Sequence, residues 1–353
     1  MQISFTPEFQ ERLQREFEQE PQKFPVQCDP ADPFHLELAL DQDMLLSFSG
    51  RLSGEYEDRH KKLPDGRTVD EWGIIRKDIY YETRFGNGSY QEMVGFPLAD
   101  DKAIFTYHPP DPNNPALYLE AEKLIREYRD EYWIVGCAVT TIFETAWALR
   151  GYENILMDFL INPDFVGELL NIPFEYNLTV AKNLTRMGVD MIWLGDDVGA
   201  QNEMLISPEL WRRFLKPKMA EIISAVKEID PRVKVAYHSD GYIIPIISDL
   251  IEIGLDILNP IQPQSMDPAL IKRKFGEHLC FWGSIDEQQT LPFGSSTEVR
   301  AEIHLLLKTI GKDGGLILAP THNVQLDTPM ENFWMMVDTI RNIPYSAVYL
   351  VFD

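Results

Sequence analysis

Cysteine is scarce in this sequence, with only Cys28, Cys137 and Cys280 among 353 residues. Three widely separated cysteines cannot form a framework of paired disulfides, so the sequence favours a reducing compartment and we expect a cytoplasmic protein. Long apolar runs are also missing, because none approaches the roughly 18 to 20 residues that span a bilayer. The N-terminus has the pattern of a polar helix over residues 1–20 and lacks the apolar region of a signal peptide.

Basic residues are few as well: 32 Lys and Arg stand against 56 Asp and Glu, for a formal net charge of −24. A surface this negative repels nucleic acid and anionic lipid, so we exclude both as partners. The same field disfavours a polyanionic small substrate, because no dense cluster of Arg and Lys opposes it. With 44% hydrophobic and 25% charged residues, the composition is that of an ordinary globular protein.

What the sequence does contain is a regular alternation that begins after residue 115. Short apolar runs predict six strands, each followed by a helical pattern, with a spacing of roughly 20 to 40 residues that is typical of βα repeats. The runs are residues 132–138, 191–194, 233–237, 256–259, 280–283 and 315–319. Because polar residues follow every run and no G-x-G-x-x-G turn is present, the pattern favours a (β/α)8 TIM barrel over a doubly wound open sheet. Two strands of such a barrel would then come from before residue 116.

The N-terminal third follows a different pattern. Residues 34–46 predict a short helix, and the stretch from 47 to about 100 is charged, aromatic and turn-rich, with PDG and GNG turns that indicate hairpins. This stretch is either a solvated surface insertion or a lid over the substrate, and both interpretations stay open. We therefore divide the chain into an N-terminal elaboration or lid at 1–115, which may supply the first barrel strands, and a main barrel at 116–353.

Histidines and an aspartate at two strand ends carry the strongest chemical signal. In VKVAYHSDG, His238 and Asp240 follow a buried strand and, being two residues apart, leave an extended segment on the same side. In LILAPTH, His322 likewise follows an apolar strand. Because parallel strands of a barrel end at one face, we expect His238, Asp240 and His322 to share a site, where imidazole nitrogen and carboxylate oxygen can bind a metal ion. The alternative is a hydrogen-bonded site without a metal.

Other polar residues at the strand ends are candidates for supporting roles. Asp197 lies in a Gly-Asp-Asp turn and Glu144 near the start of a helix, positions that turn chemistry and the helix dipole also explain. Both are nevertheless expected to face the barrel mouth, where either could serve as a catalytic acid or base or as a further metal ligand. Asn259, Gln262 and Asp286, at the following strand ends, are the candidate cofactor-binding residues.

The order and spacing of several motifs resemble those of the uroporphyrinogen decarboxylase superfamily over about residues 130–342. The motifs are LGDDVGAQNEMLISPELWRRFLKP, YHSDG, IGLDILNPIQ, FWGSIDEQQTLPFGSSTEV and GGLILAPTHNVQLDTPMEN. The resemblance implies a (β/α)8 barrel. It also implies one of two activities, since the superfamily contains decarboxylases and zinc-dependent methyltransferases that work with corrinoid proteins.

Two departures from the superfamily's motifs help to choose between the decarboxylase and the methyltransferase activity. The decarboxylases carry an arginine-rich RQAGRY-like motif for the carboxylates of their substrate, and the corresponding region here is LPDGRTVDEWGI. The coenzyme-M-type methyltransferases bind zinc through a His-x-Cys pair and a later Cys, and the matching positions here are His238, Asp240 and His322. Imidazole and carboxylate ligands leave zinc more electrophilic than thiolates do, which suits the polarisation of an oxygen atom.

The resemblance therefore implies methyl transfer from a small methylated substrate, an aryl methyl ether by our expectation, as in the methyltransferase component of an O-demethylase. Cobalamin would be carried by a separate corrinoid protein, because this chain lacks the Asp-x-His-x-x-Gly signature of a corrinoid domain. Zinc is the expected metal, and the oligomeric state is left open. The alternatives are a metal-free decarboxylase, a methyltransferase for methylamines, betaines or tetrahydrofolate, and a binding protein without catalysis.

Overall fold

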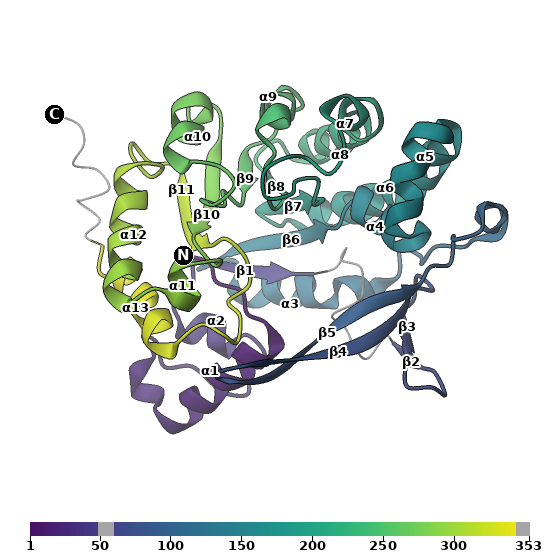
Figure 1. The fold of residues 1–353 in the computed structure, drawn as a ribbon. Coiled ribbons are helices and arrows are strands. Elements are labelled where there is room, and N and C mark those ends of the chain that lie inside the picture. Colours follow the sequence, from purple (N-terminus) through teal and green to yellow (C-terminus); the bar gives the residue numbers. More distant parts are fainter. Residues whose placement is uncertain (49–59, 344–353) are drawn as a thin grey trace.

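The computed structural model describes residues 1–48 and 60–343, so residues 49–59 of the predicted insertion and 344–353 of the predicted barrel lie outside it. Its centre is a curled sheet of seven parallel strands, in the order β1-β6-β7-β8-β9-β10-β11 (Figure 1). The strands are β1 Met44–Ser47, β6 Trp133–Val139, β7 Met191–Gly195, β8 Lys234–His238, β9 Ile257–Asn259, β10 Cys280–Ile285 and β11 Leu316–Pro320. Six of them lie within two residues of the predicted runs, and the architecture is the expected barrel-like (β/α) fold.

The N-terminus fills the gap between the two edge strands of this sheet. The backbone N–H of Gln2 donates to the carbonyl of Leu318 in β11 (3.2 Å), and Asp43, just before β1, donates to the carbonyl of Met1 (3.0 Å). The amide of Gln42 exchanges hydrogen bonds with the backbone of Ile3 (2.7 and 2.9 Å). The first residues of the chain therefore lie where an eighth strand closes a barrel.

Two sequence predictions for the N-terminal third were wrong in detail. Residues 1–20 were expected to be helical throughout, but helix α1 spans only Pro7–Gln19, because the backbone of the preceding residues pairs with the barrel. Residues 34–46 were expected to form one helix, but α2 ends at Ala39 and β1 begins at Met44. An apolar run as short as MLLS does not distinguish a buried strand from a helix end.

Helices cover the outside of the sheet (Figure 1). They are α3 Leu119–Tyr128, α4 Phe143–Arg150, α5 Tyr152–Ile161, α6 Pro163–Met187, α7 Pro208–Phe214, α8 Lys216–Ile229, α9 Ile244–Glu252, α10 Pro268–Phe275, α11 Thr290–Phe293, α12 Ser296–Lys308 and α13 Met330–Arg341. Local sequence starts several of them, as in α12, where Ser295 and Glu298 form a capping box. In the described residues, no helix combines the length and hydropathy that crossing a bilayer requires.

Alternate residues of the strands fill the inside of the barrel. A buried cluster made of one or two residues from each strand contains Met44, Val135, Cys137, Met191, Ala236, Ile257, Trp282 and Ala319. Successive side chains of a strand point to opposite faces, so these residues define which positions face inward. The same alternation applies at the carboxyl ends of the strands. His238 and Asn259 come two residues after Ala236 and Ile257, so they also face the barrel axis.

A four-stranded antiparallel sheet lies beside the barrel and contains β2 Lys61–Lys62, β3 Thr68–Val69, β4 Ile75–Thr83 and β5 Gly86–Gly95. At its base, Trp72 packs edge-on against Tyr176 of α6, with ring centroids 4.8 Å apart. Near the β4–β5 turn, the guanidinium of Arg84 donates to the carbonyl of Pro292 in α11 (2.7 Å). Because α11 follows β10, the hairpin tip contacts the loops at the carboxyl end of the barrel.

Gly195, the last residue of β7, allows β7 and β8 to approach at the point where His238 is held. Its φ is +155°, and a Cβ there would lie 2.3 Å from the carbonyl oxygen of His238. We predict that Gly195→Ala lowers the free energy of unfolding by about 3 kcal/mol, measured by urea denaturation, because it combines backbone strain with overpacking.

Gly167 provides the matched control, since a Cβ at this position in α6 meets no atom within 4 Å. Gly167→Ala should raise the stability by about 0.5 to 1 kcal/mol, because alanine is the better helix former. Equal stability of Gly195→Ala and the wild type would contradict the close approach of the two strands.

Candidate metal centre

The pairing of three neighbouring strands brings the central residues together. In the sheet, Gly195 of β7 is the partner of His238 in β8, and His238 is the partner of Asn259 in β9. His238 and Asn259 are therefore neighbours on the inner face of the barrel. The His238 ring also meets the indole of Trp193 edge-on, with centroids 5.6 Å apart, so one wall of the barrel interior limits its rotation.

The hydrogen bonds of Asn259 determine the tautomer of His238. The Nδ2 atom of Asn259 donates to the carbonyl of Trp282 (3.1 Å), which can only accept. The Oδ1 atom of Asn259 therefore faces the His238 ring, 2.7 Å from Nδ1, and Nδ1 must be the donor. In the neutral ring the proton is then on Nδ1, and the lone pair of Nε2 is available for a metal. An outer hydrogen bond of this kind is usual for a metal-binding histidine.

Two aspartates approach the available nitrogen of His238. The Oδ1 atom of Asp197 lies 3.6 Å from His238 Nε2, and the Oδ1 atom of Asp240 lies 3.9 Å from it. The ligand atoms of these three residues all lie within 4.8 Å of one another, and they form the one such group of His, Cys, Asp and Glu residues in the described part of the chain.

One oxygen of Asp240 lacks a partner. Oδ1 is buried and accepts no hydrogen bond from the residues that the structure describes, although the side chain as a whole is 27% exposed. Burial raises the pKa of Asp240, and the nearby carboxylate of Asp197 adds to the increase, while the imidazoles of His238 and His322 oppose it. A buried carboxylate oxygen without a partner is costly, and a cation between it and the His238 nitrogen would offset that cost.

The loop after β7 is fixed by hydrogen bonds to its neighbours. The carboxylate of Asp196, fully buried, accepts from the backbone N–H groups of Ile142 (2.8 Å) and Glu144 (3.0 Å) and so caps the start of α4. Burial raises the pKa of Asp196 to about 7, against the lowering effect of these N–H groups. The backbone of Asp197 donates to Glu144 Oε2 (3.0 Å), and the Oδ1 atom of Asp197 accepts from the backbone of Asp240 (2.7 Å). Asp197 therefore links the loops after β7 and β8.

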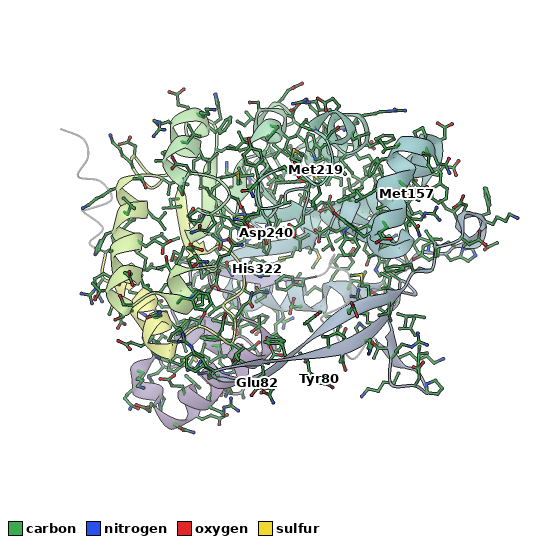
Figure 2. The ribbon with its side chains drawn as sticks, viewed as in Figure 1. Tyr80, Glu82, Met157, Met219, Asp240 and His322 are labelled. Atoms are coloured by element: carbon green, nitrogen blue, oxygen red, sulfur yellow. The ribbon has the colours of Figure 1, made fainter. Side chains whose placement is uncertain are left out.

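The cluster opens onto a cavity of about 130 Å³ at the carboxyl end of the barrel. Residues from several predicted strand ends line it: Thr140, Glu144, Asp197, His238, Asn259 and His322, together with Gln2, Ser4, Phe48, Val139, Trp193, Pro320, Thr321 and Asn323. Figure 2 labels Asp240 and His322 near the centre of the molecule. His322 is exposed, and the centroid of its ring lies 6.3 Å from that of His238.

Comparison with known proteins identifies the family. A family model described as uroporphyrinogen decarboxylase (URO-D) matches residues 84–343, well over half of the chain. The chain belongs to the uroporphyrinogen decarboxylase family. The match begins upstream of residue 130, where the sequence resemblance started, and so includes the β5 strand of the hairpin.

Curated proteins with two different named activities are similar to this chain. It is 24% identical over 162 residues to uroporphyrinogen decarboxylase 1, chloroplastic, of Oryza sativa subsp. japonica, covering 46% of this chain and 38% of that protein. It is 25% identical over 230 residues to the methylcobamide:CoM methyltransferase MtbA of Methanosarcina acetivorans, covering 65% of this chain and 64% of that protein. The chain thus spans less than two thirds of the length of either relative.

A solved structure of a methyltransferase from Methanosarcina mazei superposes with a TM-score of 0.60. The two chains are 23% identical, and the match covers 76% of this chain and 75% of the other. At this identity the similarity concerns the fold, and it agrees with the barrel predicted from the sequence.

Gln262 and Asp286, which the sequence suggested as cofactor-binding residues, form hydrogen bonds with the loops of the site. Gln262 accepts from the backbone N–H of Gly241 through Oε1 (2.6 Å), next to Asp240. Asp286 accepts from the amide of Gln264 (2.7 Å) and from the backbone of Gln288 (2.8 Å). Both side chains are buried, and neither lines the cavity beside His238. Their observed contacts are with the protein's own loops.

Sequence reasoning missed the N-terminal contribution to the cavity. Gln2 and Ser4 line it, because the N-terminal segment lies beside β11, and no local motif marks them. Sequence reasoning also placed Asp197 second to His322 as a ligand, whereas Asp197 is the one that lies in the compact group with His238 and Asp240. The Gly-Asp-Asp turn after an apolar strand was the available signal for Asp197.

We predict that Asn259→Ala lowers the affinity of the protein for zinc by about tenfold to a hundredfold, since His238 would lose the group that fixes its tautomer. Competition with a chromophoric chelator measures the change. Asn171→Ala, on the exposed surface of α6, is the control and should leave the affinity unchanged. Wild-type zinc affinity in Asn259→Ala would show that His238 does not bind the metal through Nε2.

Proposed function

We propose that this chain is a zinc-dependent methyltransferase that moves a methyl group from a small methylated donor, an aryl methyl ether, to a corrinoid protein. The observation that carries the proposal is the compact group of Asp197, His238 and Asp240, with its unpartnered buried oxygen. The similarity to a methylcobamide:CoM methyltransferase supports the reaction class. The corrinoid partner would supply the methyl acceptor, since methyl transfer from an ether needs a strong nucleophile.

The residues present suit zinc as the metal. One imidazole nitrogen and carboxylate oxygens are common zinc ligands, and a catalytic site keeps a further position for substrate. In this proposal His238 and Asp240 are ligands, and Asp197 is the stronger candidate for the third because it lies within the group. His322, predicted as a ligand from the sequence, lines the same cavity and would join from the loop after β11. Bound zinc would act as a Lewis acid toward the ether oxygen.

The residues around the cluster would bind the donor and handle a proton. The side chains of Trp193 and Phe48 line the cavity and provide apolar surface for a methoxy group. When the methyl–oxygen bond breaks, the electron pair stays on the oxygen and the methyl group passes to the partner. Glu144 lines the cavity and accepts from the backbone of Asp197, and in this proposal its carboxyl group gives the leaving oxygen its proton.

The lining of the cavity argues against the decarboxylase alternative. A porphyrinogen carries several carboxylates, which require Arg or Lys partners. Neither Arg nor Lys is among the described residues that line the cavity beside His238. Its volume of about 130 Å³ also falls below the roughly 300 to 1,000 Å³ of sites for drug-sized ligands, so it fits the reacting end of a small donor.

The test is a methyl-transfer assay with reduced cobalamin and a panel of methoxyaromatics, methylamines and betaines, followed by visible spectroscopy. We predict methylation of cob(I)alamin with a methoxyaromatic. His238→Ala should lower the rate by about a hundredfold or more and should remove most of the zinc, because one ligand is lost.

His278→Ala is the matched control, since His278 is exposed in the loop before β10, at the opposite end of the barrel. It should retain the wild-type rate and zinc content. Activity only with methylamines or betaines would overturn the ether as donor. Release of carbon dioxide from a carboxylated substrate, with no methyl transfer from any donor, would overturn the methyltransferase assignment.

A further inference from the structure

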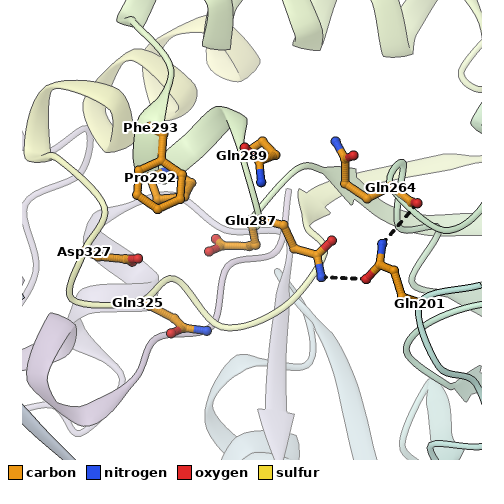
Figure 3. Close-up of a pocket in the computed structure, with 9 residues that line it drawn as sticks. Gln201, Gln264, Glu287, Gln289, Pro292, Phe293, Gln325 and Asp327 are labelled. Carbon is orange, nitrogen blue, oxygen red and sulfur yellow. Dashed lines mark hydrogen bonds between the residues drawn. The ribbon is translucent and has the colours of Figure 1, made fainter. Parts of the chain in front are cut away.

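A second pocket, of about 460 Å³, lies among the loops at the carboxyl end of the barrel (Figure 3). Its polar lining comes from the loops after β7, β9, β10 and β11 and contains five glutamines and two acids: Gln201, Gln264, Gln288, Gln289, Gln325, Glu287 and Asp327. Pro292 and Phe293 of α11 complete it with an apolar wall. The pocket shares no lining residue with the cavity beside His238.

Glu287 is the unusual member of this lining. Both carboxylate oxygens are buried, and neither accepts a hydrogen bond from the residues that the structure describes. Burial raises the pKa of Glu287 well above its ordinary value, and the carboxylates of Asp327 and Asp286 add to the increase. Figure 3 shows the carboxylate groups of Glu287 and Asp327 turned toward each other. A buried carboxylate with no partner is costly, and a cation that donates to it would stabilise its ionised form, so Glu287 would release its proton and be anionic in the complex.

Two glutamines of the lining also present acceptors. The side-chain nitrogen of Gln288 donates to Gln201 (3.3 Å) and that of Gln264 donates to Asp286 (2.7 Å), which leaves the carbonyl oxygens of Gln264 and Gln288 as acceptors. No Lys or Arg is among the described residues that line the pocket. Arg84 lies nearby, but its guanidinium donates to the carbonyl of Pro292. A ligand here therefore needs donors and a positive charge.

The apolar wall distinguishes between kinds of cation. The side chain of Phe293 is 67% exposed, so it offers a surface that alkyl carbons can cover. A hydrated metal ion gains nothing from such a surface, whereas an alkylammonium ion gains from both the wall and the carboxylates. The single aromatic ring does not form the cage that binds a quaternary ammonium ion, and an N–H donor suits the unpartnered oxygens better.

We propose that this pocket binds the protonated amine of a small molecule, with Glu287 and Asp327 as the anionic partners. The inference goes beyond the proposed methyl transfer and does not depend on it. The backbone N–H of Glu287 donates to the hydroxyl of Thr321 (3.4 Å), and Thr321 lines the cavity beside His238. The amine would thus be held next to the candidate metal centre.

Isothermal titration of the purified full chain with dimethylammonium and trimethylammonium chloride tests the proposal without any methyl-transfer assay. We predict saturable binding of both ions and about a tenfold loss of affinity in Glu287→Gln, the effect of removing one charged partner. Asp327→Asn should weaken binding in the same direction. Glu277→Gln removes an equal charge from an exposed turn before β10 and should bind as the wild type does.

Three probes distinguish the class of ligand. Tert-butanol has the alkyl groups without the charge, tetramethylammonium has the charge without an N–H, and calcium chloride supplies a metal ion. Weaker binding of all three than of trimethylammonium supports the proposal. It is overturned if calcium or tetramethylammonium binds more tightly, if no amine binds up to tens of millimolar, or if Glu287→Gln and Asp327→Asn both retain the wild-type affinity.

Discussion

The hydrogen bond between Nδ1 of His238 and Oδ1 of Asn259 is the contact on which the candidate metal centre depends. It exists because β8 and β9 pair in a register that places these residues side by side on the inner face. The carbonyl of Trp282 fixes the orientation of the Asn259 amide, and the amide in turn fixes the proton of the imidazole. The Nε2 atom of His238, the proposed ligand, is thus oriented by the sheet itself. Preorganisation of this kind lowers the entropy cost of forming the site.

The fold could be predicted from the sequence wherever a strand was long enough to show its pattern. Runs such as WIVGCAV and CFWGSI are buried on both faces, and their continuous apolar character predicted them as strands. The closure of the barrel could not be predicted, because the N-terminal residues bond to Leu318 in β11, to Val324 beyond it and to Asp43 before β1 through backbone atoms that leave no pattern in the side chains. β1 itself has four residues, too few for a periodicity to appear.

The candidate site could be predicted in part, where its residues directly follow a recognisable strand. His238 and Asp240 were identifiable because the strand before them ends abruptly and period-two spacing places them on one side. Asp197 lies in the compact group with His238 and Asp240, and His322 does not. This arrangement depends on the course of the loops after β7 and β8. Two hydrogen bonds hold these loops in place, one from the backbone of Asp197 to Glu144 and one from the backbone of Asp240 to the Asp197 carboxylate. The glutamine-lined pocket had no sequence signal either, since its residues come from four separate loops and Glu287 stands out only once its oxygens are seen to be buried.

The curated relatives of this chain include a uroporphyrinogen decarboxylase and a methylcobamide:CoM methyltransferase, and in our proposal the chemistry of the metal ligands distinguishes the two activities. X-ray absorption at the zinc edge, on the purified wild-type protein, examines that chemistry directly. Our account predicts a coordination shell of nitrogen and oxygen only, at about 2.0 to 2.2 Å, with an imidazole contribution that decreases in His238→Ala. A sulfur shell at about 2.3 Å, or a spectrum unchanged by that substitution, would contradict it.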